Sequence, residues 1–162
     1  MCLAIKTQKD KFPNKGYYYK VYQISDFDKL EVKPLFYGKS FLLRSNIVIQ
    51  GNRKSTMLSK QELTEGAVHK GIHVCNTLAE AKKYSNDDSN RIIVAVTGSI
   101  EDFVAIGNDN KQSVFTKVKI SHIVGESYTQ RRFTALNGYI TTSKKLPVET
   151  VERFFDFVVV KV

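Results

Sequence analysis

The stretch that decides the fold is Gly71–Thr97, which reads GIHVCNTLAEAKKYSNDDSNRIIVAVT. Its first five residues are rich in β-branched side chains and predict a strand. Asn76 or Thr77 then caps a predicted helix over Leu78–Tyr84, in which leucine, alanine and tyrosine recur at three-residue spacing and form one apolar stripe. Arg91–Thr97 is almost wholly apolar, which predicts a central strand that is covered on both faces.

Strand signals recur on both sides of this stretch, and the predicted strands are Gly16–Ile24, Asn46–Gln50, Asp102–Ile106 and Ser113–Ile120. A short helix is predicted over Ser59–Glu65, because Ser59 and Glu62 have the spacing of a capping box. Residues 25–46 contain Pro34 and Gly38 and are predicted to be irregular, with a short buried piece at Leu35–Tyr37.

The C-terminal part, residues 125–162, predicts a hairpin, a turn or short helix that begins at Pro147, and an apolar final strand over Phe154–Val162. So apolar a strand must be buried or paired, because an exposed one would aggregate. Taken together, the elements predict one α+β domain over residues 1–162, built mainly of antiparallel sheet with one or two short helices packed on it.

The composition is that of an ordinary globular protein and argues against a membrane-spanning one. The chain has 162 residues, of which 42% are hydrophobic and 25% charged, as in an ordinary globular protein. No apolar stretch approaches the roughly 20 residues of a membrane span, so we expect no membrane partner. The net charge is +9 and the excess is mostly lysine, which favours a long-range attraction for anions.

The positive charge is unevenly spread along the chain. Val32–Gln61 and Ser127–Val148 carry basic residues and no acid. In the predicted strand Ser113–Ile120, Lys117 and Lys119 alternate with apolar residues, which predicts a basic outer face. One side of the fold is therefore expected to be basic, although lysine-rich solvated loops would explain the two acid-free tracts equally well.

The two cysteines, Cys2 and Cys75, follow no secretory leader, so we expect a reducing cytoplasm and free thiols. His73 and Cys75 have no second ligand pair near them in the sequence, and no metal or other cofactor is predicted. His73 precedes a helix N-terminus, where backbone donors could hold an anion; a structural histidine is the alternative. Removal of Met1 would make Cys2 the amino-terminal residue, as in N-terminal-nucleophile hydrolases, and a buried apolar cysteine is the alternative.

A basic and aromatic surface is the last candidate from the residues themselves. Tyr18, Lys20 and Tyr22 share one face of the first predicted strand, and Arg131 and Arg132 form a second cluster. Rings beside cations suit base stacking together with neutralisation of phosphate. The alternative is a ladder of tyrosines packed across strands.

The segment GIHVCNTLAEAKKYS resembles the second strand and following helix of ADP-ribosyltransferase-type folds. This resemblance implies that Tyr84 packs on a nicotinamide ring and that Glu126 or Glu149 is the catalytic acid. The sequence lacks the His or Arg before a Gly-Thr pair that those folds carry earlier in the chain. A strand followed by an amphipathic helix explains the same pattern.

Several motifs together resemble an uncharacterised protein family of tailed phages and large DNA viruses: MCLAI, YYKVY, GIHV, EAKKY, and DFVAIG followed by SVFTKVKI. The resemblance covers residues 1 to about 124 and implies an accessory protein of the host-cell cytoplasm. We therefore expect non-catalytic binding of an anionic partner, a nucleotide-type signal or nucleic acid, that antagonises a host defence system. The alternatives are one of the two enzyme types above, or a protein-binding inhibitor of a host enzyme that uses the final strand for sheet augmentation. Monomer and homo-oligomer both stay open.

Overall fold

The computed structural model describes residues 8–29, 31–35, 38–44, 46–86, 90–107 and 109–124, and the backbone of residues 147–150 and 158–159. The described helices are η1 (Lys9–Lys11), α1 (Lys60–Glu65), α2 (Leu78–Ser85) and η2 (Ile100–Asp102). The described strands are β1 (Tyr18–Asp26), β2 (Glu31–Pro34), β3 (Phe41–Leu42), β4 (Val48–Gly51), β5 (Ala67–Val68), β6 (Ile72–Cys75), β7 (Arg91–Thr97), β8 (Phe103–Ile106), β9 (Gln112–Phe115), β10 (Lys117–Val124), β11 (Pro147–Thr150) and β12 (Val158–Val159).

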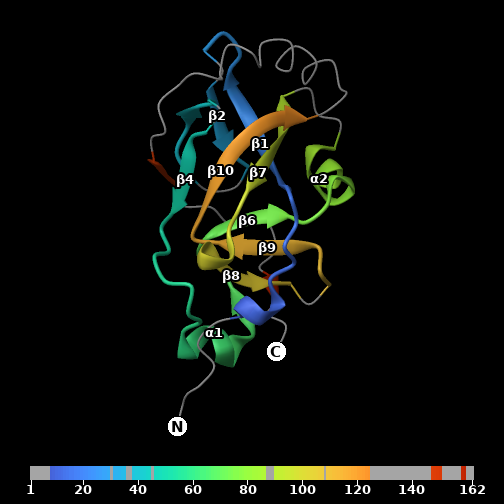
Figure 1. Cartoon of the computed structure of the whole chain (residues 1–162). Helices are drawn as coiled ribbons and strands as arrows, with labels where there is room; N and C mark the ends of the chain where they lie inside the picture. Colours follow the sequence, from blue (N-terminus) through green and yellow to red (C-terminus); the bar gives the residue numbers. More distant parts are fainter. Residues whose placement is uncertain are drawn as a thin grey trace.

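Ten of these strands form one sheet, in the order β11-β4-β10-β7-β1-β6-β9-β8, with β2 beside β1 and β3 beside β2. Every pairing in this sheet is antiparallel except that of β11 with β4. In Figure 1, β6, β8 and β9 run crosswise to β1, β7 and β10, so the sheet bends strongly between its two halves. The α+β prediction is confirmed.

The main core lies on one side of this bent sheet. It includes Tyr18 and Tyr22, which lie on one face of β1, and the fully buried rings of Phe103 and Phe115. The Phe115 ring packs edge-to-face on both Tyr18 and Phe103, with centroids 5.0 and 5.6 Å apart. These contacts join the β8–β9 half of the sheet to β1.

The opposite side of β1 and β7 is covered by α2, which lies at the right in Figure 1. Ala81 of α2 packs with Val21, Ile93 and Cys75, and the partly buried Tyr84 borders the same cluster. Thr77 caps the helix by accepting a hydrogen bond from the Glu80 amide at 3.2 Å. β7 is therefore covered on both faces, as its continuous apolar run predicts.

Three predictions about elements are wrong. Residues 25–46 are not simply irregular, because β2 and β3 lie within them. Ser113–Ile120 is two strands rather than one: at Thr116 the chain turns a corner, where the Thr116 amide donates to Asp102 O and its carbonyl accepts from Gly51 N. β9 then pairs with β6, while β10 pairs with β4 and β7. Residues 147–150 form a strand beside β4 instead of a turn or short helix.

The final strand is paired within the chain at the residues that the structure describes. Val158 and Val159 lie opposite Val68 and Ala67 of β5, in an antiparallel two-stranded sheet. The predicted hairpin between residues 127 and 142 lies outside the described residues. Among the helices that the structure describes, none is both long and apolar enough to span a bilayer.

Candidate functional site

The predicted binding face of β1 is part of the protein interior. Tyr18, Lys20 and Tyr22 do share one face, but that face belongs to the main core: the two tyrosines are 0% exposed and Lys20 is 3% exposed. Lys20 Nζ donates to the backbone carbonyl of His73 at 2.6 Å. The prediction of an exposed stacking and phosphate-binding surface is therefore wrong for these three residues.

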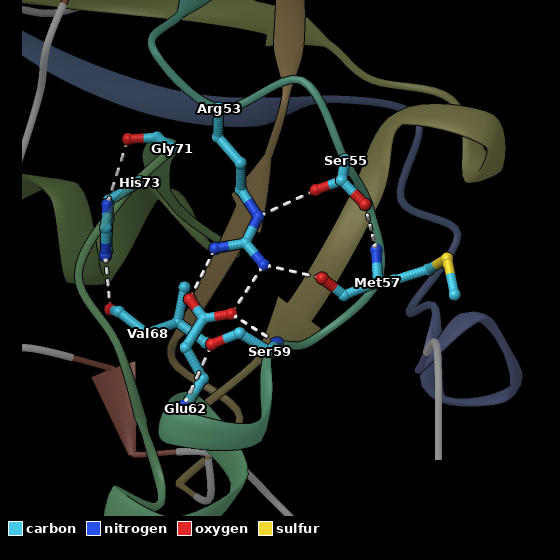
Figure 2. A network of polar contacts seen from close by, with 8 residues as sticks. All are labelled: Arg53, Ser55, Met57, Ser59, Glu62, Val68, Gly71 and His73. Carbon is cyan, nitrogen blue, oxygen red and sulfur yellow. Dashed lines mark hydrogen bonds and ion pairs between the residues drawn. The ribbon is translucent and has the colours of Figure 1, made fainter. Parts of the chain in front are cut away.

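His73 is also buried and has a structural environment. Its ring lies between two backbone carbonyls, with Nε2 3.2 Å from Val68 O and Nδ1 3.4 Å from Gly71 O (Figure 2). Burial lowers the pKa of His73 to about 4, so the ring is neutral near pH 7. On the same strand, burial raises the pKa of the Cys75 thiol to about 12. Neither side chain reaches solvent, so the anion-binding prediction for His73 is not supported.

Arg53 organises the loop that precedes α1, as Figure 2 shows. Its guanidinium forms a bidentate ion pair with Glu62, with Nη1–Oε2 at 2.5 Å and Nη2–Oε1 at 2.7 Å. Nε also donates to Ser55 O and Nη2 to Met57 O. Glu62 Oε1 accepts from the Ser59 amide, and Ser59 Oγ accepts from the Glu62 amide, which completes the predicted capping box.

This network borders a groove of about 660 Å³ beside α1, lined by Arg53, Lys54, Ser55, Met57, Leu58, Ser59, Gln61, Glu62, Glu65, His69 and Lys70. Burial acts to raise the pKa of the Glu62 carboxyl, but hydrogen bonds from Arg53 and Ser59 outweigh it and hold that pKa below its ordinary value. The carboxylate therefore stays charged and neutralises Arg53. Glu62 and Glu65 offset two of the three cations of this groove, Arg53, Lys54 and Lys70, so its net positive charge is small.

The outer face of β10 carries cations that no acid pairs with in the described part of the chain. Lys117 is exposed and Lys119 partly exposed, and both point away from the core that Val118 and Ile120 enter. The strand register places Lys117 opposite Gln50 and Lys119 opposite Val48 of β4. The prediction of a basic outer face is confirmed for these two lysines.

A β-bulge brings His122 onto the same face. The register shifts between Ile120, which lies opposite Val96, and His122, which lies opposite Ala95. Ser121 is the extra residue, so His122 faces outward where strict alternation would turn it into the core. Ile123 then takes the inward position and is 4% exposed.

The Tyr17 ring completes the face. It is 44% exposed and packs edge-to-face on the His122 ring, with centroids 5.0 Å apart. Ser121 Oγ lies 2.9 Å from His122 Nδ1. When the Ser121 hydroxyl donates to Nδ1, a neutral imidazole must carry its proton on Nε2, which makes Nε2 a hydrogen-bond donor. We call Tyr17, Lys117, Lys119 and His122 the basic–aromatic face.

A hollow of about 390 Å³ adjoins the two lysines, lined by Val48, Thr97, Gly98, Ser99, Asp102, Lys117, Val118 and Lys119. Asp102 is the one acid among these lining residues. Its two carboxylate oxygens accept hydrogen bonds from Thr116 Oγ1 at 3.3 Å and Ser99 Oγ at 3.1 Å. The cations thus outnumber the acid at the hollow, and that acid already has two hydroxyl donors.

Tyr84 is the one remaining predicted site residue whose side chain the structure describes. Tyr84 belongs to α2 and is partly buried against the cluster around Ala81, and its hydroxyl accepts a hydrogen bond from Gln112 Nε2. Cys2, Glu126, Arg131 and Arg132 lie outside the described residues, and only the backbone of Glu149 is described. Within the described residues, no three His, Cys, Asp or Glu side chains are grouped so that they could hold a metal ion.

Comparisons with protein-family models, curated proteins and solved structures found nothing that matches this chain. The residues of the basic–aromatic face were partly visible in the sequence: the lysine alternation indicates Lys117 and Lys119. His122 was missed, because a bulge leaves no recognisable signal in a single sequence. Strand alternation places Tyr17 on the face opposite Tyr18, and at this end of β1 that face is the exposed one.

Proposed function

We propose that this protein binds an anionic partner of the nucleotide or nucleic-acid class on the basic–aromatic face. The observation that carries the proposal is the position of Lys117 and Lys119 on one outward face, beside the exposed ring of Tyr17. Proteins that bind nucleic acid without sequence preference stack its bases on exposed aromatic rings. Cations next to these rings neutralise the phosphates.

The charge of the whole chain supports the same partner. A net charge of +9 attracts polyanions at long range, and the local face then supplies the contacts. Of the described residues that suggested other chemistry, His73 and Cys75 are buried, and Tyr84 is partly buried on the inner side of α2. By this proposal, the protein is a phage-like accessory protein that counters a host defence system by holding a nucleotide signal or a nucleic acid.

The test is a binding titration of the purified protein at low salt, with a cyclic dinucleotide, ATP and a short oligonucleotide as ligands. We expect at least one of them to bind, and the double variant Lys117→Gln/Lys119→Gln to weaken its binding by about tenfold or more. The matched control is Lys54→Gln/Lys70→Gln, which removes the same charge from the groove beside α1. Equal loss in both variants, or no binding of any ligand at low salt, would contradict the proposal.

A further inference from the structure

The contact residues of the basic–aromatic face are spread along one strand. From His122 to Lys117, β10 covers five residue steps, or about 16 Å at the usual rise per residue. The ring pair lies toward one end of this line, Lys119 lies in the middle, and Lys117 lies at the other end. A partner that touches all of them must therefore be elongated and carry repeated negative charge.

From this layout we infer that the ligand is a single-stranded nucleic acid that runs along β10, an inference that rests on the proposed function. One base stacks on Tyr17 beside His122, and successive phosphates lie against Lys119 and Lys117. A duplex fits this face poorly, because its bases are already stacked on one another and present no free surface to a protein ring.

The register partners of the two lysines are all uncharged. Lys117 lies opposite Gln50 of β4, and Lys119 lies between Val48 of β4 and Thr97 of β7. The hollow beside them contains Ser99, whose hydroxyl already donates to Asp102. Asp102 is the one acid that lines this hollow, beside the two lysines.

The experiment measures fluorescence anisotropy of a labelled oligothymidylate of about twelve nucleotides, a length within the site size of known single-strand modules. With two phosphates neutralised, the logarithm of the binding constant should fall against the logarithm of salt concentration with a slope of about −1.4. Affinity should therefore weaken about sevenfold between about 50 and about 200 mM salt. Oligouridylate of the same length should bind equally, because neither contact involves the sugar.

Single variants of the protein show which side chains contact the oligonucleotide. Lys117→Gln and Lys119→Gln should each reduce the slope to about −0.7, while Lys60→Gln, in α1 at the far end of the molecule, should leave it unchanged (Figure 1). Tyr17→Ala should weaken binding about fivefold or more without changing the slope, and Tyr17→Phe should preserve it.

Other outcomes separate the inference from the function on which it rests. If a nucleoside triphosphate or a duplex of the same length binds as tightly as the single strand, and the lysine variants still weaken binding, the single-strand inference fails and the proposed function stands. If the oligonucleotide binds and none of these variants affects it, the inference fails together with the placement of the binding site on this face. If no nucleotide or nucleic acid binds at low salt, both fail.

Discussion

The ammonium group of Lys20 donates a 2.6 Å hydrogen bond to the backbone carbonyl of His73, inside the protein. In the described structure, β1 and β6 share a single register pair, Tyr19 with Cys75, at the place where the sheet bends. The hydrogen bond from the Lys20 side chain therefore adds a second connection between β1 and β6 at this bend. It also sets a positive charge near the His73 ring, where burial is the larger reason and Lys20 a further reason that the pKa of His73 is low.

The low pKa of His73 predicts a loss of stability in mild acid. The pKa is about 4 in the folded protein and 6.5 in the unfolded chain, so between these values only the unfolded chain takes up the proton. The contribution of His73 is complete above pH 6.5 and is lost as pH falls toward 4, by about 3 kcal/mol in all. Urea unfolding at a series of pH values measures this loss directly.

Proton NMR gives an independent reading, because the chain has only three histidines. The His73 ring signal should not shift until the pH approaches 4, whereas a midpoint near 6.5 would show that the ring is open to solvent. The variant His73→Gln should remove the corresponding part of the pH dependence of unfolding, whatever its effect on stability at neutral pH.

The geometry of the Arg53–Glu62 pair indicates that lysine at position 53 cannot replace arginine without a loss of stability. Arg53 is 9% exposed, and its guanidinium serves Glu62 and two backbone carbonyls at once. A lysine ammonium has no planar fork and would leave some of these acceptors unbonded inside the protein. We expect Arg53→Lys to lower the free energy of unfolding by about 2–4 kcal/mol in urea titrations. Lys60→Gln, a surface change in the same region, should stay within about 0.5 kcal/mol of wild type.

A side chain at Gly98 should disturb the packing next to the basic–aromatic face. A Cβ at this position would lie 2.6 Å from the ring of Phe115, which is fully buried, so the ring or the backbone must shift. Gly98→Ala should therefore destabilise the protein by about 1–3 kcal/mol. Gly16→Ala is the matched control, because no atom lies within 4 Å of its Cβ position, and its effect should be neutral or slightly stabilising. Equal thermal unfolding temperatures for the two variants would show that Phe115 repacks freely.

Local signals in the sequence predicted the elements well where one segment decides its own structure. The apolar run Arg91–Thr97 is a strand with those bounds, and the Ser59–Glu62 spacing is a capping box. Both signals come from residues within a few positions of one another, and the distant contacts of this fold agree with them.

Distant contacts decided what the sequence could not predict. Both faces of β1 are aromatic, so alternation shows which residues share a face but not which face is inside. Lysine is rarely buried, and Lys20 is buried because a carbonyl 53 residues away accepts its hydrogen bond. β11 likewise pairs with β4, which lies far from it along the chain, and such pairing has no local signature.

Because of the bulge at Ser121, we expect β10 to tolerate deletion of that residue. Deleting Ser121 would restore regular alternation, with Ile120 inward, His122 outward and Ile123 inward, which is the arrangement already present. The change loses the hydrogen bond between Ser121 and His122 and little of the core, so we expect a loss of about 1–2 kcal/mol and retained oligonucleotide binding.

Deleting Lys119 instead should be far more damaging. Val118 is fixed by its register with Ile49 of β4, so the next residue, Ile120, would turn outward. Ile120 is 0% exposed, and losing it from the core should cost about 2–5 kcal/mol. The bulge cannot compensate, because its extra residue follows Ile120 in the chain. Urea titrations of the two deletion variants compare these costs, and equal destabilisation would mean that the bulge does not set which side chains of β10 face outward.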